Sequence, residues 1–356
     1  MSKIYLIRHA KPDFPNDERY CLGRTDMPIG TLGRLQCVLM AENKKFEALS
    51  GVYSSTLLRA RDTAAYLGKK VAIRTGLEEV YAGEWDGLSF SQIKKQYGDI
   101  YTARGLDKTI PIPGSENIRK AEKRFQTAVV GIAEESAGDV AITAHKSVIQ
   151  SLAAALSGVP LEECHQFELP YCSYTLLEYD GLLHLMEVGV FEKPPLNEKL
   201  CRKLLREAGA SDDLEAHCSK VAEKAMKITD ELSCAGLVLD RELIYFSSLL
   251  HDIARSEPGH ADIGAKWLSE LGYISAAGII RQHHDIEFSG INEAAVVYIA
   301  DKCVRCACDV TLEKRFSGSL AKCTSPGALE AHKRRYDSAL KIKNEINRIC
   351  GKEAVV

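Results

Sequence analysis

A short apolar run near the start of the chain, residues 3–10, ends on an arginine and a histidine, Arg8 and His9. Its β-branched and aromatic residues, bounded by polar ones, predict a buried strand. In an open parallel sheet the reactive side chains lie where the strands end, so we expect Arg8 and His9 at the mouth of a crevice. The Arg-His pair alone says little about function, because so short a motif often occurs by chance.

Two later stretches have the same organisation. Residues 51–64 predict a strand and then an alanine-rich helix whose first turn carries Arg59. Residues 139–156 predict a second buried strand, which ends on His145, followed by another helix. Because parallel strands end at the same edge of a sheet, two histidines and two arginines are expected to converge there.

Further motifs lie between and around these strand ends. They are residues 6–10, a turn-helix stretch at 23–33, residues 53–55 with Arg59, Ala60, Thr63 and Ala64, residues 77–87, residues 113–116, and Ala144 with His145. In this order they resemble the histidine phosphatase superfamily, which has the phosphoglycerate mutase-like fold. The resemblance covers about the first half of the chain. It implies an α/β domain over residues 1–192, with a mostly parallel sheet and flanking helices.

The resemblance also implies a chemistry for the converging side chains. His9 would attack phosphorus and form a phosphohistidine, and Arg8, Arg59 and His145 would bind the phosphoryl oxygens. Planar arginine forks suit a phosphomonoester dianion, and the same cations disfavour protonation of a nucleophilic imidazole. His145 would also stabilise the charge that spreads over the oxygens in the transition state. The resemblance implies no cofactor in this domain.

For the proton donor and for the rim of this site, the sequence leaves more than one candidate. Glu79 aligns with the family's proton donor to the leaving group, and the same carboxylate would then activate water. Glu78 and Glu84 are the alternatives. Lys146 stands where the family commonly has glycine, which predicts an extra cation at the rim or a displaced loop. The segment from Glu79 to His145 is short for the mutases, so a hydrolase is favoured over a phosphomutase.

Length and composition limit the number of domains and the class of protein. A chain of 356 residues can form two domains, and 46% hydrophobic with 27% charged residues is ordinary for a soluble globular protein. A net charge of -3 gives no support for a nucleic-acid or membrane surface. The twelve cysteines are scattered, with no signal peptide or spanning segment among them. They are expected to be reduced thiols in a cytoplasmic protein.

Three cysteines, Cys303, Cys306 and Cys308, form the one tight cysteine cluster in the sequence. A zinc site there would need a fourth ligand, for which Cys323 is available. Because the three fall within a predicted helix, the preferred interpretation is that they are small buried or half-buried residues.

The first domain is expected to continue to about Val190 and to end in a hairpin around Asp180-Gly181. Residues 191–197 contain a Pro-Pro pair and break all periodicity, so they are the expected linker. After them the strand patterns stop. Residues 198–350 are expected to form an almost entirely helical second domain.

In this second half, ionisable residues lie on the apolar stripes of predicted helices. One helix begins near Asp212, where Asp212 and Glu215 have capping-box spacing. Another runs over 240–254, a third closes near 285, and a fourth begins near 292. Burying charged groups singly would be costly, so they are best explained if they meet around a metal. These residues are His217, His251, Asp252, His283, His284 and Asp301.

Three motifs in this half match a known helical metal site. Residues 249–254 contain the adjacent His251-Asp252 pair, residues 298–302 contain Asp301, and His217 stands four residues before Val221-Ala222. They resemble the HD phosphohydrolase superfamily, named for its His-Asp pair, from about residue 217 to 301. The resemblance implies an all-α domain.

The HD resemblance implies one or two divalent metals, with Asp252 bridging between them. The ligands of the first would be His217, His251, Asp252 and Asp301. The second would be held by His260, His283 and His284, although His284 is alternatively a bystander beside His283. Mixed imidazole and carboxylate ligation suits iron, manganese, nickel or cobalt. Such a pair would activate a bridging water and stabilise phosphate oxygens during in-line attack.

The sequence therefore predicts a two-domain phosphohydrolase without nucleic-acid or membrane partners. The first domain would hydrolyse a small phosphomonoester through phosphohistidine. The second would hydrolyse a phosphate ester, expected to be that of a nucleotide. Two alternatives stay open: the HD domain is a regulatory nucleotide-sensing module, or the first domain is a phosphomutase.

Overall fold

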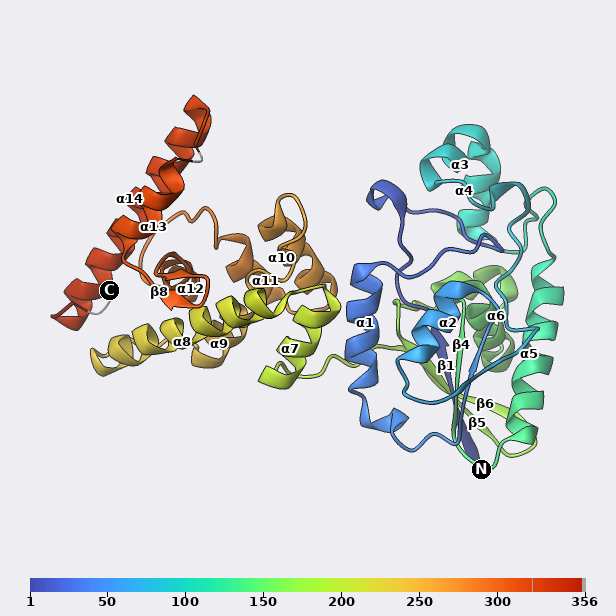
Figure 1. The fold of residues 1–356 in the computed structure, drawn as a ribbon. Helices are drawn as coiled ribbons and strands as arrows, with labels where there is room; N and C mark the ends of the chain where they lie inside the picture. Colours follow the sequence, from blue (N-terminus) through green and yellow to red (C-terminus); the bar gives the residue numbers. More distant parts are fainter. Residues whose placement is uncertain (322, 354–356) are drawn as a thin grey trace. The chain divides into compact units, whose positions relative to one another are not determined.

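The computed structural model describes residues 1–321 and 323–353. The chain divides into two compact units, Met1–Pro194 and a second unit from Pro195 onward. Residues 191–197 form neither helix nor strand. In Figure 1 the first unit, blue to green, is a sheet covered by helices, and the second, yellow-green to red, is built of helices. None of the described helices combines the length and apolar character needed to cross a bilayer.

The sheet of the first unit is mostly parallel, with strand order β3-β2-β4-β1-β5-β6. Strands β1 to β4 are mutually parallel where they pair, and β5 and β6 continue the sheet in antiparallel fashion. The predicted hairpin around Asp180 is confirmed as the β5–β6 connection at the sheet edge. The strands are β1 (Ser2–Arg8), β2 (Gly51–Ser54), β3 (Val71–Ile73), β4 (Val140–Ala144), β5 (Tyr174–Tyr179) and β6 (Leu183–Val190).

Both faces of this sheet are buried, which explains why β1 is a continuous apolar run rather than an alternating one. Ile4 and Leu6 pack in one core with α5 and α6, and Tyr5 and Ile7 pack in another with α1 and α2. The helices are α1 (Thr31–Ala41), α2 (Leu58–Ala65), α3 (Phe90–Gln96), α4 (Gly98–Leu106), α5 (Ile118–Glu135) and α6 (Lys146–Ser157). Short 3-10 helices are η1 (Pro15–Asp17), η2 (Lys44–Phe46), η3 (Gly83–Trp85) and η4 (Leu161–Gln166).

The second unit is organised around α12, whose residues are buried on all sides as expected for a helix that is apolar all round. It packs against α8, α9, α11 and α14. The helices are α7 (Glu198–Glu207), α8 (Asp212–Cys234), α9 (Arg241–Leu250), α10 (His260–Glu270), α11 (Ile274–Arg281), α12 (Glu293–Lys302), α13 (Leu312–Leu320) and α14 (Pro326–Cys350). A small hairpin, β7 (Val304–Arg305) and β8 (Cys308–Asp309), follows α12.

In this unit α8 begins at Asp212 as predicted but with a different cap, and the predicted end of α9 is wrong. Helix α8 is capped by the Ser211 hydroxyl, which accepts from the Leu214 amide, and Glu215 binds Arg206 instead of closing a capping box. Helix α9 ends at Leu250 rather than at 254. The His251 ring donates to the Ser248 carbonyl at 2.7 Å, and Ile253 then bonds the Leu250 carbonyl in a tighter turn. His251 and Asp252 therefore lie just after the helix.

The preferred interpretation of the cysteine cluster is right for Cys303 and wrong for the other two residues. Cys303 is buried, but Cys306 and Cys308 are exposed on the β7–β8 hairpin. Cys306 has a φ of 56°, which a continuing helix does not allow, and Asp309 of the hairpin pairs with Lys224 of α8 at 3.5 Å. Within the described residues, no cysteine belongs to a group of side chains placed to hold a metal.

Candidate active site and metal centre

The four side chains predicted at the sheet edge are brought together. Arg8 ends β1, His145 follows β4, and the His9 amide donates to the Ala144 carbonyl at 3.0 Å. Arg59 reaches the same edge from the second position of α2. The His9 and His145 rings lie 5.2 Å apart, centroid to centroid. Both histidines and Arg59 are buried in this unit.

His9 is held in a form that leaves one ring nitrogen available. Its Nδ1 donates to the Ala10 carbonyl at 2.8 Å, so Nε2 carries the lone pair. Burial, together with the charges of Arg59 and Arg8, lowers the pKa of His9 well below its ordinary value. A neutral imidazole with a free Nε2 is the nucleophilic form.

His145 is arranged to donate rather than to attack. Its Nε2 lies 2.8 Å from the Ser55 hydroxyl, which can donate to it and leave the ring proton on Nδ1. Burial, Arg59 and His9 lower the pKa of His145 well below its ordinary value. His145 Nδ1 is buried without a partner, as are the Nε groups of Arg8 and Arg59. Buried donors without partners are costly, and a bound oxyanion would satisfy them.

The loop that precedes α1 fixes the Arg59 guanidinium. Arg59 donates to the carbonyls of Gly23 and Thr25 at 3.0 and 2.9 Å. The loop is held in turn by Asp86, whose carboxylate accepts from the Gly23 and Thr25 amides at 2.8 and 3.1 Å. A Cβ on Gly23 would lie 2.5 Å from the Ala82 nitrogen, so only glycine fits there. Residues from the motifs at 23–33 and 77–87 thus position one arginine.

Sequence reasoning missed a residue that supports Arg8. The Arg8 guanidinium lies 3.7 Å above the Tyr171 ring and donates to the Leu169 carbonyl. Tyr171 also faces His9, at 5.7 Å between ring centroids. Tyr171 lies in a turn before β5, far from every strand-end motif, so no local pattern marks it.

A pocket of about 270 Å³ opens onto His9 and Arg8. Glu79 lines it, and its carboxylate accepts from the Ser147 and Val148 amides at the start of α6, at 3.0 and 3.2 Å. The two alternative carboxylates do not line this pocket: Glu78 binds the Gly76 amide, and Glu84 accepts from the Tyr97 hydroxyl. Lys146 begins α6 and lines the pocket, so it is an extra cation at the site.

The lowered pKa values of His9 and His145 predict a pH dependence. The NMR signals of both rings are expected to stay unchanged in the folded protein through the pH range in which they titrate in urea, near about 6.5. Because the unfolded chain binds these protons first, the unfolding free energy falls as the pH drops below about 6.5, by roughly 1.4 kcal/mol per pH unit for each histidine. A titration midpoint near 6.5 in the folded protein would contradict this assignment.

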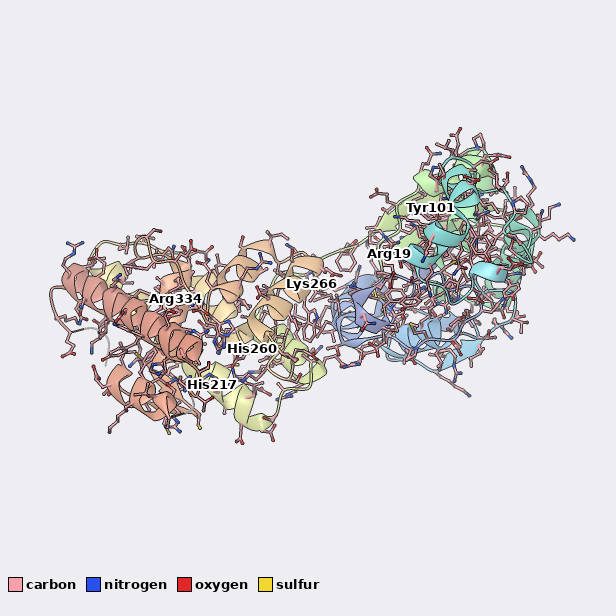
Figure 2. All side chains as sticks on the ribbon, turned by 90° about the horizontal axis from the view of Figure 1, so that it is seen from above. Arg19, Tyr101, His217, His260, Lys266 and Arg334 are labelled. Carbon is pink, nitrogen blue, oxygen red and sulfur yellow. The ribbon has the colours of Figure 1, made fainter. Side chains whose placement is uncertain are left out.

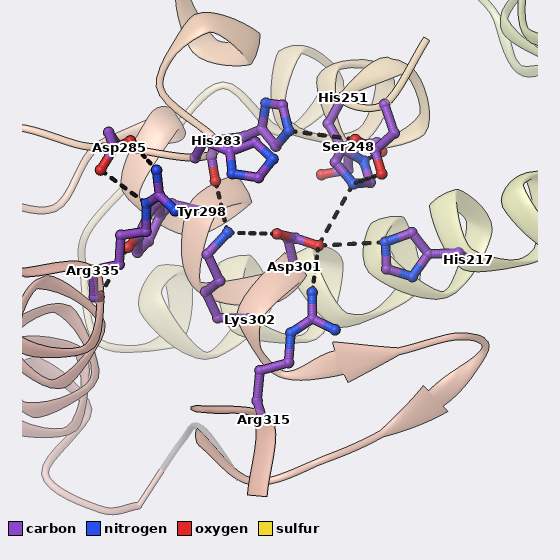
Figure 3. A network of polar contacts seen from close by, with 12 residues as sticks. His217, Ser248, His251, His283, Asp285, Tyr298, Asp301, Lys302, Arg315 and Arg335 are labelled. Atoms are coloured by element: carbon purple, nitrogen blue, oxygen red, sulfur yellow. Dashed lines mark hydrogen bonds and ion pairs between the residues drawn. The ribbon is translucent and has the colours of Figure 1, made fainter. Parts of the chain in front are cut away.

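The second unit gathers imidazoles around two buried carboxylates, Asp252 and Asp301. Figure 3 shows Asp301 with the imidazoles of His217 and His251. Asp252 lies 3.1 Å from His260 Nε2, 3.4 Å from His283 Nε2 and 3.5 Å from His251 Nε2. His284 joins the cluster through His260, with 2.9 Å between their Nε2 atoms. Asp252 is therefore placed between two groups of ligand atoms, His217–His251–Asp252 and His260–His283–His284.

Asp301 completes the first group. Its carboxylate lies 3.3 Å from His217 Nε2 and 3.7 Å from His251 Nε2. His217 comes from α8 and His260 from α10, both labelled in Figure 2, and Asp301 comes from α12. The cluster therefore links helices that are distant in sequence. All the metal-binding residues predicted from sequence lie in this one cluster.

Three of the imidazoles are oriented by backbone carbonyls. Nδ1 of His217, His251 and His283 donates to the carbonyls of Cys306, Ser248 and Ile280, at 2.7, 2.7 and 2.6 Å. This fixes each ring so that Nε2 points to the carboxylates, as outer-shell partners of metal ligands do. His251 Nε2 and Asp252 Oδ1 have no hydrogen-bond partner although they are buried. A nitrogen and carboxylate donor set of this kind fits a divalent metal.

Protonation competes with metal binding at this cluster. Burial would lower the pKa of His251, but Asp252 raises it well above its ordinary value. Burial and the Lys302 ammonium lower the pKa of His284 to about 3, so that ring is neutral. A metal held here would have to displace the His251 proton, so its affinity is expected to rise with pH.

Two supporting contacts of the cluster were not predicted from the sequence, although Lys302 lies within the motif at 298–302. The Lys302 ammonium donates to Asp301 at 2.7 Å and to the His283 carbonyl at 2.9 Å (Figure 3). Asp285, next to His284, accepts from Arg335 of α14 at 3.0 and 2.6 Å. Helix α14 therefore holds the loop that carries two histidines, although it lies well beyond the HD motifs.

Comparisons with known proteins agree with this arrangement. Residues 4–184 match the family model described as the histidine phosphatase superfamily (branch 1), and residues 214–306 match the HD domain. The chain is 25% identical over 187 residues to putative phosphoserine phosphatase 2 of Hydrogenobacter thermophilus, covering 51% of this chain and 91% of that protein.

Two further similarities are to a curated protein and a solved structure. Glucosyl-3-phosphoglycerate phosphatase of Mycobacterium tuberculosis is 31% identical over 174 residues, 45% of this chain and 77% of that protein. The structure of Bacillus stearothermophilus YhfR is 27% identical, covers 54% of this chain and 98% of its own, and superposes with a TM-score of 0.50. The chain belongs to the histidine phosphatase superfamily, is a phosphoric ester hydrolase, and carries an HD domain in its second half.

Proposed function

We propose that the first domain hydrolyses a small phosphorylated metabolite through a phosphohistidine on His9. The observation that carries this proposal is the free Nε2 of a neutral His9, fixed by the Ala10 carbonyl beside Arg8 and Arg59. The name of the mycobacterial relative, a phosphatase of glucosyl-3-phosphoglycerate, supports this substrate class.

In the proposed reaction, His9 Nε2 attacks phosphorus and the bond from phosphorus to the leaving oxygen breaks. Glu79 gives its proton to that oxygen, so the product leaves as a neutral alcohol. Water then attacks the phosphohistidine, Glu79 takes a proton from it, and inorganic phosphate leaves. Arg8, Arg59 and His145 donate to the phosphoryl oxygens throughout.

For the HD domain we propose hydrolysis of a phosphate ester, with a nucleotide as the substrate. His217, His251, Asp252 and Asp301 would hold one divalent metal, and His260, His283 and His284 with Asp252 a second. Such metals supply positive charge to phosphate oxygens and activate water. The half-exposed Arg255 guanidinium, 3.6 Å from Asp252, is placed to bind a phosphate oxygen beside them.

The test is phosphate release from sugar phosphates, nucleotides and dinucleotides by the full chain, with and without a chelator. Hydrolysis of phosphomonoesters is expected to survive chelation, and hydrolysis of a nucleotide is expected to require added manganese, iron, nickel or cobalt. Loss of monoester hydrolysis on chelation would contradict the phosphohistidine proposal. Tight nucleotide binding without turnover by the metal-loaded protein would favour the sensing module instead.

A further inference from the structure

The phosphatase pocket has more cations than one phosphoryl group needs. Arg8 and Arg59 already meet the phosphoryl oxygens in the proposed reaction. Four further cations line the pocket and are less buried than His9. They are Arg19 (labelled in Figure 2), Arg104, Lys108 and Lys146.

The carboxylates of the pocket do not neutralise these four cations. Glu79 accepts from neutral backbone amides of α6 and so offsets at most one of these charges, and Glu116 is engaged by the Arg124 guanidinium at 2.7 and 2.8 Å. Among the residues that the structure describes, none of the four cations has a carboxylate within ion-pair distance. The pocket therefore carries more positive than negative charge.

Lys146 is the clearest case. It is the first residue of α6, where the helix dipole disfavours a cation, and it is only partly exposed. Burial and the charges of Arg8, Arg19 and Lys108 lower the pKa of Lys146, opposed by Glu79. A lysine in such a position destabilises the free protein, and an anion bound beside it would remove that cost.

Arg104 and Lys108 are fixed to each other through the backbone. The Lys108 ammonium donates to the Arg104 carbonyl at 2.6 Å, and the Arg104 guanidinium donates to the carbonyls of Lys108 and Ile110. Carbonyl partners hold a cation in place without cancelling its charge. The two side chains are thus ordered before any ligand arrives, which lowers the entropic cost of binding an anion.

We propose that this pocket binds a phosphomonoester whose leaving group carries a second anionic group, and that Lys146, with Lys108 and Arg104, binds that group. The inference rests on the proposed phosphatase function of the same site. Either a carboxylate or a second phosphate would supply the negative charge that these cations bind. Pairs of substrates with and without that group distinguish the two.

The experiment compares kcat/KM for substrates that differ in the second anion alone. 3-Phosphoglycerate against glycerol 3-phosphate tests a carboxylate, and fructose 1,6-bisphosphate against fructose 6-phosphate tests a phosphate. At least one acidic substrate is expected to be preferred by about tenfold or more, as for a charge-assisted contact. In Lys146→Gln that preference should fall by about tenfold, with little change for the uncharged partner.

Lys70→Gln, a change at an exposed lysine outside the pocket, is the matched control and should keep the full preference. Lys108→Gln provides a second variant, with the same expected loss of preference. Equal kcat/KM within both pairs, or a preference that survives in both pocket variants, would overturn the inference while leaving the phosphatase proposal intact. Absence of activity on every monoester would overturn both.

Discussion

Replacement of His9 with alanine is expected to lower the turnover of phosphomonoesters by about four orders of magnitude or more. The variant lacks the Nε2 that attacks phosphorus, and His145 cannot replace it because its Nε2 is engaged by Ser55. Steady-state phosphate release measures the effect. His184→Ala, at an exposed histidine on β6, is the matched control and should retain full activity.

Binding of inorganic phosphate distinguishes loss of the nucleophile from loss of the fold. His9→Ala keeps Arg8, Arg59 and His145, so calorimetry should show that it still binds phosphate. A variant that binds phosphate but does not hydrolyse monoesters supports the assignment. Retention of a tenth or more of the wild-type turnover would show that another group carries the reaction.

Asp252→Asn is expected to abolish the metal-dependent activity of the HD domain and to leave the phosphatase activity unchanged. The substitution keeps the shape of the side chain but removes the negative charge that lies within 3.5 Å of three imidazoles. Loss of an outer-shell partner typically costs about 10- to 100-fold, so loss of the bridging ligand should cost at least about 100-fold.

Metal content after dialysis and hydrolysis of the nucleotide found by the substrate panel measure this effect. Asp262→Asn is the matched control, because Asp262 is an exposed aspartate of the same domain, on α10. It should keep the metal and the activity. If Asp252→Asn retains both, the cluster does not hold the metal.

The parts of the fold that follow from local chemistry were predictable from sequence. The apolar run of β1 could only be buried on both faces, and strands that end on Arg8 and His145 place them at one edge. The HD residues could be predicted because ionisable side chains on the apolar faces of helices are costly to bury without partners. In each case a short stretch carries both the structural signal and the reactive residue.

Other features depend on contacts between distant segments and could not be predicted. Tyr171 supports Arg8 only because its turn folds over the sheet edge. Helix α9 ends early because the His251 ring binds the Ser248 carbonyl, which side-chain pattern does not reveal. Cys306 follows a helical sequence pattern, but it lies in a hairpin whose Asp309 pairs with the distant Lys224.

The central claim, a phosphohistidine on His9, is tested most directly by trapping the phosphorylated protein. The experiment uses the full chain carrying Asp252→Asn, which is expected to remove the activity of the HD domain. The protein is mixed with a monoester that it hydrolyses, and the reaction is quenched in alkali during turnover. The protein is then digested for mass spectrometry. The account predicts an acid-labile phosphate on the peptide that contains His9, and none when His9→Ala is added. Continued hydrolysis with no phosphorylated peptide, or with phosphate on another residue, would contradict it.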